Sequence, residues 1–429
     1  MRRIDTDVIV VGAGVAGLAA ARLLSRHRLR CEVLEASAAI GGRLRTVRRP
    51  GWQMPIELGA EFVHGRPAPT LALEHGALPL VHVPEHRVRV ASSVEPMNDT
   101  WSRIADLLAP AREGPEQSLS AFWDQVRPRA EDAELVRSVI EGYHAAALED
   151  VSAPLIAEDA WRSRKDFKQY RSADGYDHVL ASLEHGLSDR SVRIRLQTRA
   201  RVIGWARDEV TVACDSPRGQ QEVHARRCVV TASLGVLQAR HDGGIVLSPT
   251  PQAFVEAVSR LGMGHVRRVV LRLARRLWPA PIDGVEATFA QVPGAPFPTL
   301  WREARAGQEQ VTTWAGGPQA SALANASEAE LVTAALESLA RASDTDLPAC
   351  RSALIEAHQH DFSRDPLVRG AYSYARVGAG DAARVLAQGW ADTLFFAGEA
   401  LDLQYPGTIA GALGSGEHAA RRLLSTWPD

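Results

Sequence analysis

The chain has 429 residues, more than one domain usually contains, so we expect at least two domains. Hydrophobic residues make up 45% and charged residues 23% of it, which excludes a largely disordered or collagen-like chain. The formal charge of −2 gives no net attraction to nucleic acid, and no apolar run reaches the roughly 18–20 residues of a membrane-spanning helix. The four cysteines lie far apart, so neither a disulfide framework nor a metal site is indicated. We therefore expect a cytoplasmic enzyme without nucleic-acid or membrane partners; its oligomeric state is not indicated.

The first 35 residues predict a strand, a glycine turn, a helix and a second strand. Residues 7–11 (DVIVV) form an apolar run typical of a parallel strand buried on both faces. Gly12, Gly14 and Gly17 follow with GxGxxG spacing: the first permits a tight turn, the second admits a pyrophosphate, and the third lets helix and strand pack closely. Glu35 ends the second strand and is placed to accept hydrogen bonds from a ribose. The pattern predicts nucleotide binding but does not distinguish NAD from FAD.

The remaining elements are predicted from periodicity and capping signals. A helix-rich insert is expected over residues 76–172, followed by a helix at 179–187 and strands within 201–214, 222–233 and 266–278. Ser327 and Glu330 have the spacing of a capping box and predict the start of a helix over 327–342. Residues 393–424 are expected to form a strand, a loop and a helix.

A second glycine pair follows Glu35 in the run ASAAIGGRLR at residues 36–45. Here the chain resembles the flavin-containing amine oxidase family, which includes monoamine oxidases, polyamine oxidases and histone-demethylating amine oxidases. The resemblance implies that FAD is the cofactor and that Gly41, Gly42 and Arg43 lie against its pyrophosphate.

Further segments carry the same resemblance over nearly the whole chain. The run LGAEFVHG at 58–65 implies that Gly59 and Ala60 lie close to the flavin ring. Val202 matches the position whose backbone binds adenine, and Glu399, in LFFAGEAL, matches a glutamate bonded to the ribitol chain. In PGTIAGALGSGEHAA, Thr408 and Ile409 match the helix start at the pyrimidine end of the flavin.

The resemblance also implies a fold. It is α/β, with a Rossmann-like FAD-binding domain of the glutathione-reductase type interleaved with an α+β substrate domain of mixed sheet plus helices. The FAD-binding domain is expected at residues 1–75, 174–262 and 376–429, and the substrate domain at 76–173 and 263–375.

The chain departs from the family pattern near the flavin. Arg268 stands where the family has a lysine that holds a water near flavin N5. An arginine keeps the charge but has no accessible neutral form, so both an oxidase and a dehydrogenase stay open. Tyr372 matches one of two tyrosines that flank the flavin in membrane-bound members; Thr408 replaces the second, and Ala371 replaces the cysteine that attaches the flavin. Non-covalent FAD and half an aromatic cage are therefore expected.

Two polar residues in the 58–65 segment are candidates for contact with the substrate. His64 matches a histidine that lies close to the substrate amine in polyamine-oxidising relatives, although a lone histidine is more often structural. Glu61 could pair with a cationic amine or serve as a salt-bridge partner. Both alternatives stay open for each residue.

The expected function is FAD-dependent oxidation of an amine, either a polyamine or a monoamine. Hydride would leave the carbon next to nitrogen for flavin N5, giving an imine and then an aldehyde, and oxygen would reoxidise the flavin to give hydrogen peroxide. The predicted catalytic residues are Arg268, His64, Tyr372 and Thr408, and the predicted substrate contacts are His64, Glu61 and Tyr372. Three alternatives stay open: an L-amino-acid oxidase, a desaturase or protoporphyrinogen-type FAD dehydrogenase acting on a non-amine, and a flavin-bearing interaction protein without turnover.

Overall fold

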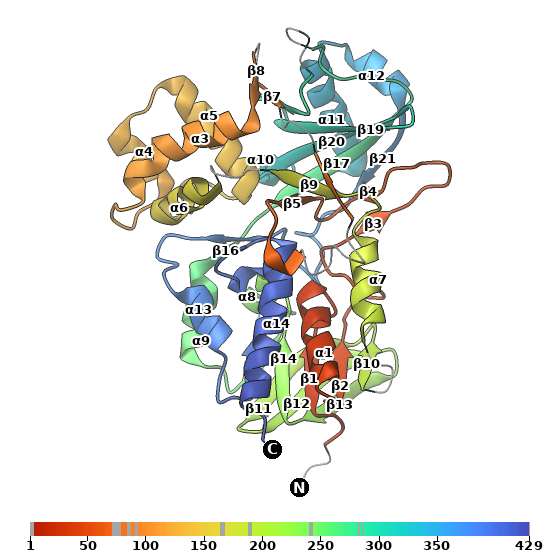
Figure 1. Cartoon of the computed structure of the whole chain (residues 1–429), viewed down its shortest axis with the longest axis vertical. Helices are drawn as coiled ribbons and strands as arrows, with labels where there is room; N and C mark the ends of the chain where they lie inside the picture. The colour runs from red at the N-terminus through yellow and green to blue at the C-terminus, as the bar shows by residue number, and fades with distance from the viewer. Residues whose placement is uncertain are drawn as a thin grey trace.

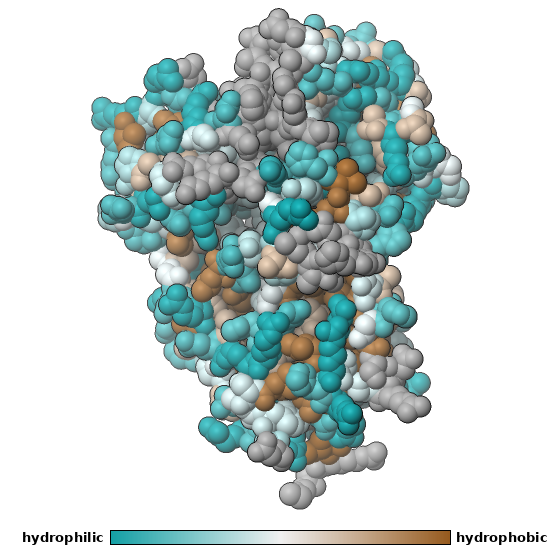
Figure 2. All heavy atoms as spheres, viewed as in Figure 1, coloured by the Kyte–Doolittle hydropathy of each residue, from teal (hydrophilic) through white to brown (hydrophobic). Residues whose placement is uncertain are grey.

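A computed structural model describes residues 4–70, 79–83, 87–90, 93–163, 168–187, 191–239, 243–281, 284 and 286–428. The protein has two lobes, and both ends of the chain lie in the same lobe (Figure 1). On the face drawn in Figure 2, hydrophobic residues lie in small groups among hydrophilic ones. Among the described helices, none is long and apolar enough to cross a membrane.

The lobe that holds the chain ends is built on a parallel five-stranded sheet. Its strand order is β10 (Val192–Arg195), β2 (Cys31–Leu34), β1 (Val8–Val11), β14 (Arg227–Val230) and β23 (Leu394–Phe396). Neighbouring strands pair in parallel, with Val8 opposite both Cys31 and Arg227. This is the Rossmann-like arrangement that the first 35 residues predict.

Burial on both faces explains why β1 is an uninterrupted apolar run. Val8 and Val10 face a hydrophobic cluster with helices α1 (Val15–Arg26), α7 (Asp177–His185) and α14 (Ile409–Ser425). Ile9 and Val11 face the opposite cluster, which contains residues of an antiparallel sheet and of α9 (Gln252–Arg260) and α13 (Ala382–Gln388). Successive side chains of a strand point to opposite faces, so both kinds of position must be apolar here.

The antiparallel sheet of this lobe has four strands in the order β13 (Gly219–Ala225), β12 (Glu209–Ser216), β11 (Arg199–Ala206) and β15 (Val246–Ser248). The register of β11 shifts between Ala200 and Val202, which marks a bulge at the start of the strand. The short helix α8 (Leu234–Gln238) follows β14 and is capped by the Ser233 side chain.

The other lobe contains a seven-stranded sheet. Its order is β21 (Leu354–Gln359), β17 (Val266–Leu273), β20 (Gln308–Gly316), β19 (Thr299–Arg305), β18 (Phe289–Gln291), β7 (Arg87–Val90) and β8 (Ser93–Pro96). Helices α11 (Glu328–Ser343) and α12 (Leu347–Ala353) share a hydrophobic cluster with this sheet, and α10 (Pro318–Ala322) follows β20. The predicted capping box of Ser327 and Glu330 is present at the start of α11.

The segment 76–172 is less helical than the sequence suggests. It does contain the helices α3 (Met97–Leu108), α4 (Leu119–Val126), α5 (Ala130–His144) and α6 (Ala153–Ser163) with the short turn η1 (Ala109–Ala111), which together form one hydrophobic cluster. It also contributes β7 and β8 to the large sheet, and β6 (Leu80–His82) and β9 (Gln169–Ser172) to a smaller one. The prediction of a helix-rich insert is therefore incomplete, because short strands that complete sheets started elsewhere carry little local signal.

Three small sheets complete the fold of the described residues. β5 (Phe62–His64) and β6 both pair with β9, and His64 lies opposite Gln169. β16 (Leu261–Met263) pairs with β22 (Ser373–Ala375), and β3 (Thr46–Val47) pairs with β4 (Ile56–Glu57). The strands of the two large sheets fall on either side of the expected domain boundaries, but the boundaries themselves stay a prediction.

Candidate active site

A cavity of about 1290 Å³ runs from the end of β1 to the helices α3, α5 and α6. It is larger than the roughly 300–1,000 Å³ of an ordinary small-molecule pocket, so it has room for a cofactor and a substrate together. Its lining comes from both lobes, with a glycine-rich portion at one end and an aromatic portion at the other.

The glycines after β1 have the distinct roles that their spacing predicts. Gly12 has φ +103°, a left-handed conformation that favours glycine, and it carries the turn from β1 into α1. A Cβ on Gly17 would lie 2.0 Å from the Gly12 carbonyl oxygen, so only glycine allows this approach of helix to turn. A Cβ on Gly14 would have no heavy atom within 4 Å, because Gly14 borders the open cavity.

The amino end of α1 provides free donors at the cavity. Gly14 is the N-cap of this helix and supplies no side-chain cap, so the first N–H groups are left for a ligand. The helix dipole adds partial positive charge at the same point, an arrangement suited to a pyrophosphate.

Glu35 fixes the turn beside those donors. One of its carboxylate oxygens accepts a hydrogen bond from the Ala13 N–H at 2.7 Å and the other from the Ser37 N–H at 2.8 Å. Each oxygen keeps a further acceptor site, and Glu35 lines the cavity, so the carboxylate can still accept from a ribose hydroxyl.

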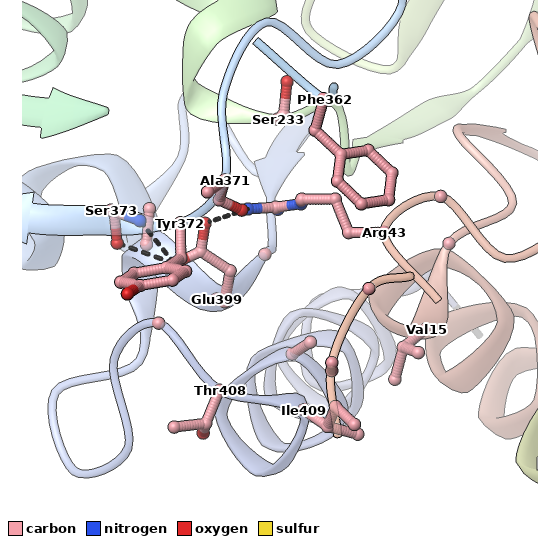
Figure 3. Close-up of a pocket in the computed structure, with 18 of the residues that line it drawn as sticks. Val15, Arg43, Ser233, Phe362, Ala371, Tyr372, Ser373, Glu399, Thr408 and Ile409 are labelled. Carbon is pink, nitrogen blue, oxygen red and sulfur yellow. Dashed lines mark hydrogen bonds and ion pairs between the residues drawn. The ribbon is translucent and has the colours of Figure 1, made fainter. Parts of the chain in front are cut away.

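Arg43 joins the amino-terminal and carboxy-terminal parts of the cavity (Figure 3). Its Nη1 donates to the Ala371 carbonyl oxygen at 2.8 Å and to Glu399 Oε1 at 2.6 Å. The other oxygen of Glu399 accepts from the Ser373 hydroxyl at 2.6 Å. These bonds hold the two segments in one geometry along the cavity wall.

Tight backbone packing places the neighbouring segment. Gly41 and Gly42 have φ values of +123° and +60°, and Gly41 donates its N–H to the Ala13 carbonyl at 2.9 Å. A Cβ on Gly59 would lie 1.9 Å from the Arg43 carbonyl oxygen, so this position also requires glycine. Gly59 and the adjacent Ala60 therefore lie flush with the cavity wall.

A second helix begins at the cavity with α14. Thr408 is its N-cap and accepts a hydrogen bond from the Gly411 N–H at 3.1 Å. The N–H groups of Ile409 and Ala410 lie in the first turn of α14, where no carbonyl of the helix can accept their hydrogen bonds. Both residues line the cavity, so these N–H groups are suited to stabilising negative charge there.

Tyr372 and Trp314 form part of the aromatic portion. Their rings are stacked, with centroids 6.5 Å apart and planes at 15°. The Tyr372 hydroxyl donates to the Tyr143 carbonyl oxygen at 2.7 Å, and burial raises the pKa of this phenol. A Cβ on Gly407 would lie 3.6 Å from Tyr372 Cδ2, which places the ring next to the turn that leads to Thr408.

His64 lies on β5 in the same portion. Its ring meets the ring of Tyr143 edge-on, with centroids 5.6 Å apart, and that of Phe62 at 6.4 Å. Burial lowers the pKa of His64 to about 4, so the imidazole is neutral at pH 7 and places no positive charge in the cavity.

Arg268 and Glu61 form a buried ion cluster. Arg268 donates to Glu61 Oε2 and, at 2.7 Å, to the Gly59 carbonyl oxygen. The other oxygen of Glu61 lies 3.0 Å from Arg171 Nη2 and accepts from Trp301 Nε1 at 2.8 Å. Both carboxylate oxygens are therefore engaged, which favours the salt-bridge alternative for Glu61 over a direct contact with substrate.

Burial sets the protonation equilibria of this cluster. It lowers the pKa of the Arg268 guanidinium, which Glu61 partly offsets, and it raises the pKa of Glu303, whose Oε2 lies 3.5 Å from Arg171. The Nε of Arg268 is buried without a hydrogen-bond partner in the described part of the chain.

The cavity collects nearly all the residues that the sequence singles out. Those lining it are Gly12, Gly14, Glu35, Gly41, Gly42, Arg43, Gly59, Ala60, Glu61, His64, Arg268, Tyr372, Glu399, Thr408 and Ile409. Gly17 lies behind the wall, where it packs helix against turn.

The prediction for Val202 is wrong. This residue does not line the cavity; it lies beyond the bulge of β11, pairs with Val246 of β15 and is 37% exposed. Thr198, Arg199 and Ala200, at the start of the strand, line the cavity instead. Several positions of β11 carry small or apolar side chains, so the sequence of the strand does not show which of these residues contacts a ligand.

The sequence did not predict that Arg171 and Trp301 contact Glu61, or that the Trp314 ring stacks on Tyr372. Arg171, Trp301 and Trp314 lie more than 100 residues from Glu61 along the chain, on β9, β19 and β20. No strand was predicted for the segments that hold Trp301 and Trp314, and nothing local indicates which face of a sheet these side chains occupy.

The fold and the cavity define a dinucleotide-binding protein whose cavity continues beyond the glycine-rich end into an aromatic chamber. A sequence model described as flavin-containing amine oxidoreductase matches residues 15–424, and the chain belongs to this family. The family resemblance, the α/β fold and the expectation of non-covalent FAD are thereby confirmed.

Two relatives illustrate the similarity in sequence. A protein from Oryza sativa subsp. japonica named lysine-specific histone demethylase 1 homolog 2 is 31% identical over 99% of this chain and 57% of its own length. Probable polyamine oxidase 4 from Arabidopsis thaliana is 25% identical over 97% of this chain and 87% of its own. The chain spans 53–57% of the length of three histone-demethylase relatives that it matches, so it corresponds to only part of each of them.

Solved structures share the fold. Putrescine oxidase bound to putrescine is superimposed with a TM-score of 0.79 at 18% identity, covering 98% of this chain and 99% of that one. Cyclohexylamine oxidase from Brevibacterium oxydans IH-35A gives 0.79 at 20% identity with the same coverage.

The residues at the glycine-rich end fit FAD. The uncapped start of α1, the space above Gly14 and the carboxylate of Glu35 suit a pyrophosphate and a ribose. The start of α14 adds partial positive charge along the remaining length of the cavity, next to Arg43, whose charge Glu399 balances. Ala371 lines the cavity and has no side-chain nucleophile for a covalent bond to the flavin.

Proposed function

We propose that the protein oxidises an amine, either a polyamine or a monoamine, to an imine that water hydrolyses to an aldehyde. FAD supplies the acceptor for the hydride from the carbon next to nitrogen, and oxygen is the final acceptor, giving hydrogen peroxide. The aromatic portion of the cavity carries this proposal. The cytoplasmic location stays a prediction.

The aromatic walls favour the reactive form of an amine. Only a neutral amine has a lone pair that can stabilise the developing iminium, and an apolar enclosure lowers the pKa of an amine because it disfavours the charged form. The rings of Phe62, His64, Trp301, Trp314 and Tyr372 provide such an enclosure.

The charge balance of Arg268 argues against an L-amino-acid oxidase. Such an enzyme needs a cation aimed at the substrate carboxylate next to the reacting carbon. Of the six arginines that line the cavity in the described part of the chain, Arg268 is the buried one, and Glu61 already balances its charge. A second carboxylate there would compete with Glu61 for the same guanidinium.

The chain's own groups position the reaction. The fixed hydroxyl of Tyr372 holds its ring against the chamber, and the neutral His64 can exchange a hydrogen bond with an amine without repelling it. The N–H groups at the start of α14 favour negative charge that develops on the cofactor side of the cavity.

The first test is anaerobic bleaching of the visible flavin band by polyamines, monoamines and L-amino acids, followed by admission of air. We expect bleaching by amines, then recovery of colour with one equivalent of peroxide. Bleaching by L-amino acids alone would replace the proposal with an amino-acid oxidase. A flavin that no amine bleaches would overturn it in favour of a non-amine substrate.

The contribution of Arg268 to the oxygen step has its own test. We propose that the Arg268 guanidinium assists oxygen reduction, because it lines the cavity and stays a cation although it is paired with Glu61. Arg268→Lys should change the rate of flavin reoxidation by oxygen measured in a stopped-flow instrument. An unchanged rate in a variant that is still bleached by amines would contradict this link.

A further inference from the structure

Helix α6 borders the cavity with a carboxylate. Leu155, Asp159 and Arg162 recur at helical spacing along the side of α6 that lines the cavity. Leu155 is 38% exposed, and the Asp159 side chain is 30% exposed, so this part of the cavity is open to water. Asp159 therefore lies where the chamber opens and not in its closed interior.

The other cavity-lining carboxylates are engaged by close donors. Glu35 and Glu399 accept hydrogen bonds within 2.9 Å, and Glu61 belongs to the buried ion cluster. Asp365 and Asp402 accept hydrogen bonds from backbone N–H groups within their own loops. All five therefore already accept hydrogen bonds from other groups of the protein.

Asp159 differs from them. Its contact in the described part of the chain is with His144, whose Nε2 lies 3.8 Å from Oδ2, beyond hydrogen-bond length. Burial lowers the pKa of His144, so the imidazole is neutral at pH 7 and does not cancel the charge of Asp159. Arg162 lines the cavity too, but its Nε lies 3.9 Å from Glu158.

A short series of contacts connects Asp159 to His64 on β5. The ring of His64 meets that of Tyr143, whose centroid lies 5.0 Å from that of His144, and His144 contacts Asp159. These contacts place the carboxylate and His64 on one wall of the chamber, separated by the side chains of Tyr143 and His144.

We propose that Asp159 binds a second, protonated nitrogen of the substrate, so that the preferred substrates are diamines or polyamines. This inference rests on the proposed amine oxidation. One nitrogen enters the aromatic portion in its neutral form, while the other keeps its proton at the partly hydrated carboxylate. A hydrogen-bonded contact between an ammonium and a carboxylate favours binding by about tenfold or more.

The test compares 1,n-diaminoalkanes of four to ten carbons with n-alkylamines of equal length, using the FAD-loaded protein. We expect the wild type to show a higher kcat/KM for diamines, with an optimum at one chain length. Asp159→Asn should lower kcat/KM for the best diamine by about tenfold, chiefly through KM, and leave that for the alkylamine within about twofold. Asp159→Glu extends the carboxylate by one methylene and should move the optimum to a diamine about one carbon shorter.

Glu158→Gln is the matched control. It removes one charge from the same turn of α6, but Glu158 pairs with Arg112 and does not line the cavity. We expect it to keep the preference for diamines. If the wild type oxidises both series equally, or if Asp159→Asn keeps the full preference, the inference is wrong although amine oxidation stands. If no amine of either series bleaches the flavin, the proposed function itself fails.

Discussion

Removing the charge of Glu61 should destabilise the protein, because two arginines would lose their shared counterion. Glu61→Gln keeps the shape of the side chain but leaves Arg268, which is 5% exposed, without a compensating charge. Breaking a buried ion pair by removing one partner costs about 3–5 kcal/mol. The unfolding entropy of 429 residues, at about 2.1 cal/mol/K per residue, converts this cost into a fall in Tm of at least about 3 °C.

The assay is thermal unfolding of the apoprotein at pH 7, followed by circular dichroism. Glu303→Gln is the control, because Glu303 also faces Arg171 but at 3.5 Å and with a side chain that is 29% exposed. It should lower Tm by less than about 1 °C, since a partly exposed ion pair contributes less than about 1 kcal/mol. The double variant Glu61→Gln, Arg268→Met should regain part of the loss, which a double-mutant cycle measures. Equal effects of Glu61→Gln and Glu303→Gln would refute this account of the cluster.

The glycine turn and a buried carboxyl give two further predictions. Gly17→Ala should lower the Tm of the apoprotein by about 2 °C or more, because the added Cβ would meet the Gly12 carbonyl oxygen. Gly14→Ala should leave the Tm of the apoprotein unchanged, because the added Cβ meets no other atom. It should instead weaken FAD binding, measured by fluorescence titration, by about tenfold. The reverse pattern would contradict the assigned roles. Burial raises the pKa of Glu57 from its ordinary value of 4.5 to about 7. Between these two pH values the folded state holds a proton that the unfolded state has lost. The free energy of unfolding therefore falls as the pH rises from 4.5 to 7. Glu57→Gln should remove that fall, a gain over wild type of up to about 3 kcal/mol between pH 4.5 and 7 in urea unfolding; parallel pH profiles for the two proteins would count against it.

The parts of the site that follow from local sequence were predictable. The spacing of the glycines between β1 and α1 is enough to predict the turn that joins them. The capping box formed by Ser327 and Glu330 is enough to predict where α11 begins. The strand, loop and helix predicted for residues 393–424 are present as β23, the segment after it and α14.

The parts that depend on distant pairing were not predictable. Glu61 finds its partners Arg171, Arg268 and Trp301 on three other strands, and nothing near Glu61 in the chain identifies them. Val202 was misplaced because a single bulge shifts the register of β11, and one residue of shift exchanges the two faces of a strand.

The bond between Arg43 and Glu399 has a consequence for how the protein is made. The two residues are 356 positions apart, yet together they form one wall of the cofactor cavity. Helix α14 also packs so closely on α1 that a Cβ on Gly416 would lie 2.2 Å from the Ala16 carbonyl oxygen. During synthesis the glycine turn therefore leaves the ribosome long before the segment that completes it. Stable loading of the cofactor must wait until the last helix has emerged, so a nascent chain stalled before residue 399 would remain colourless.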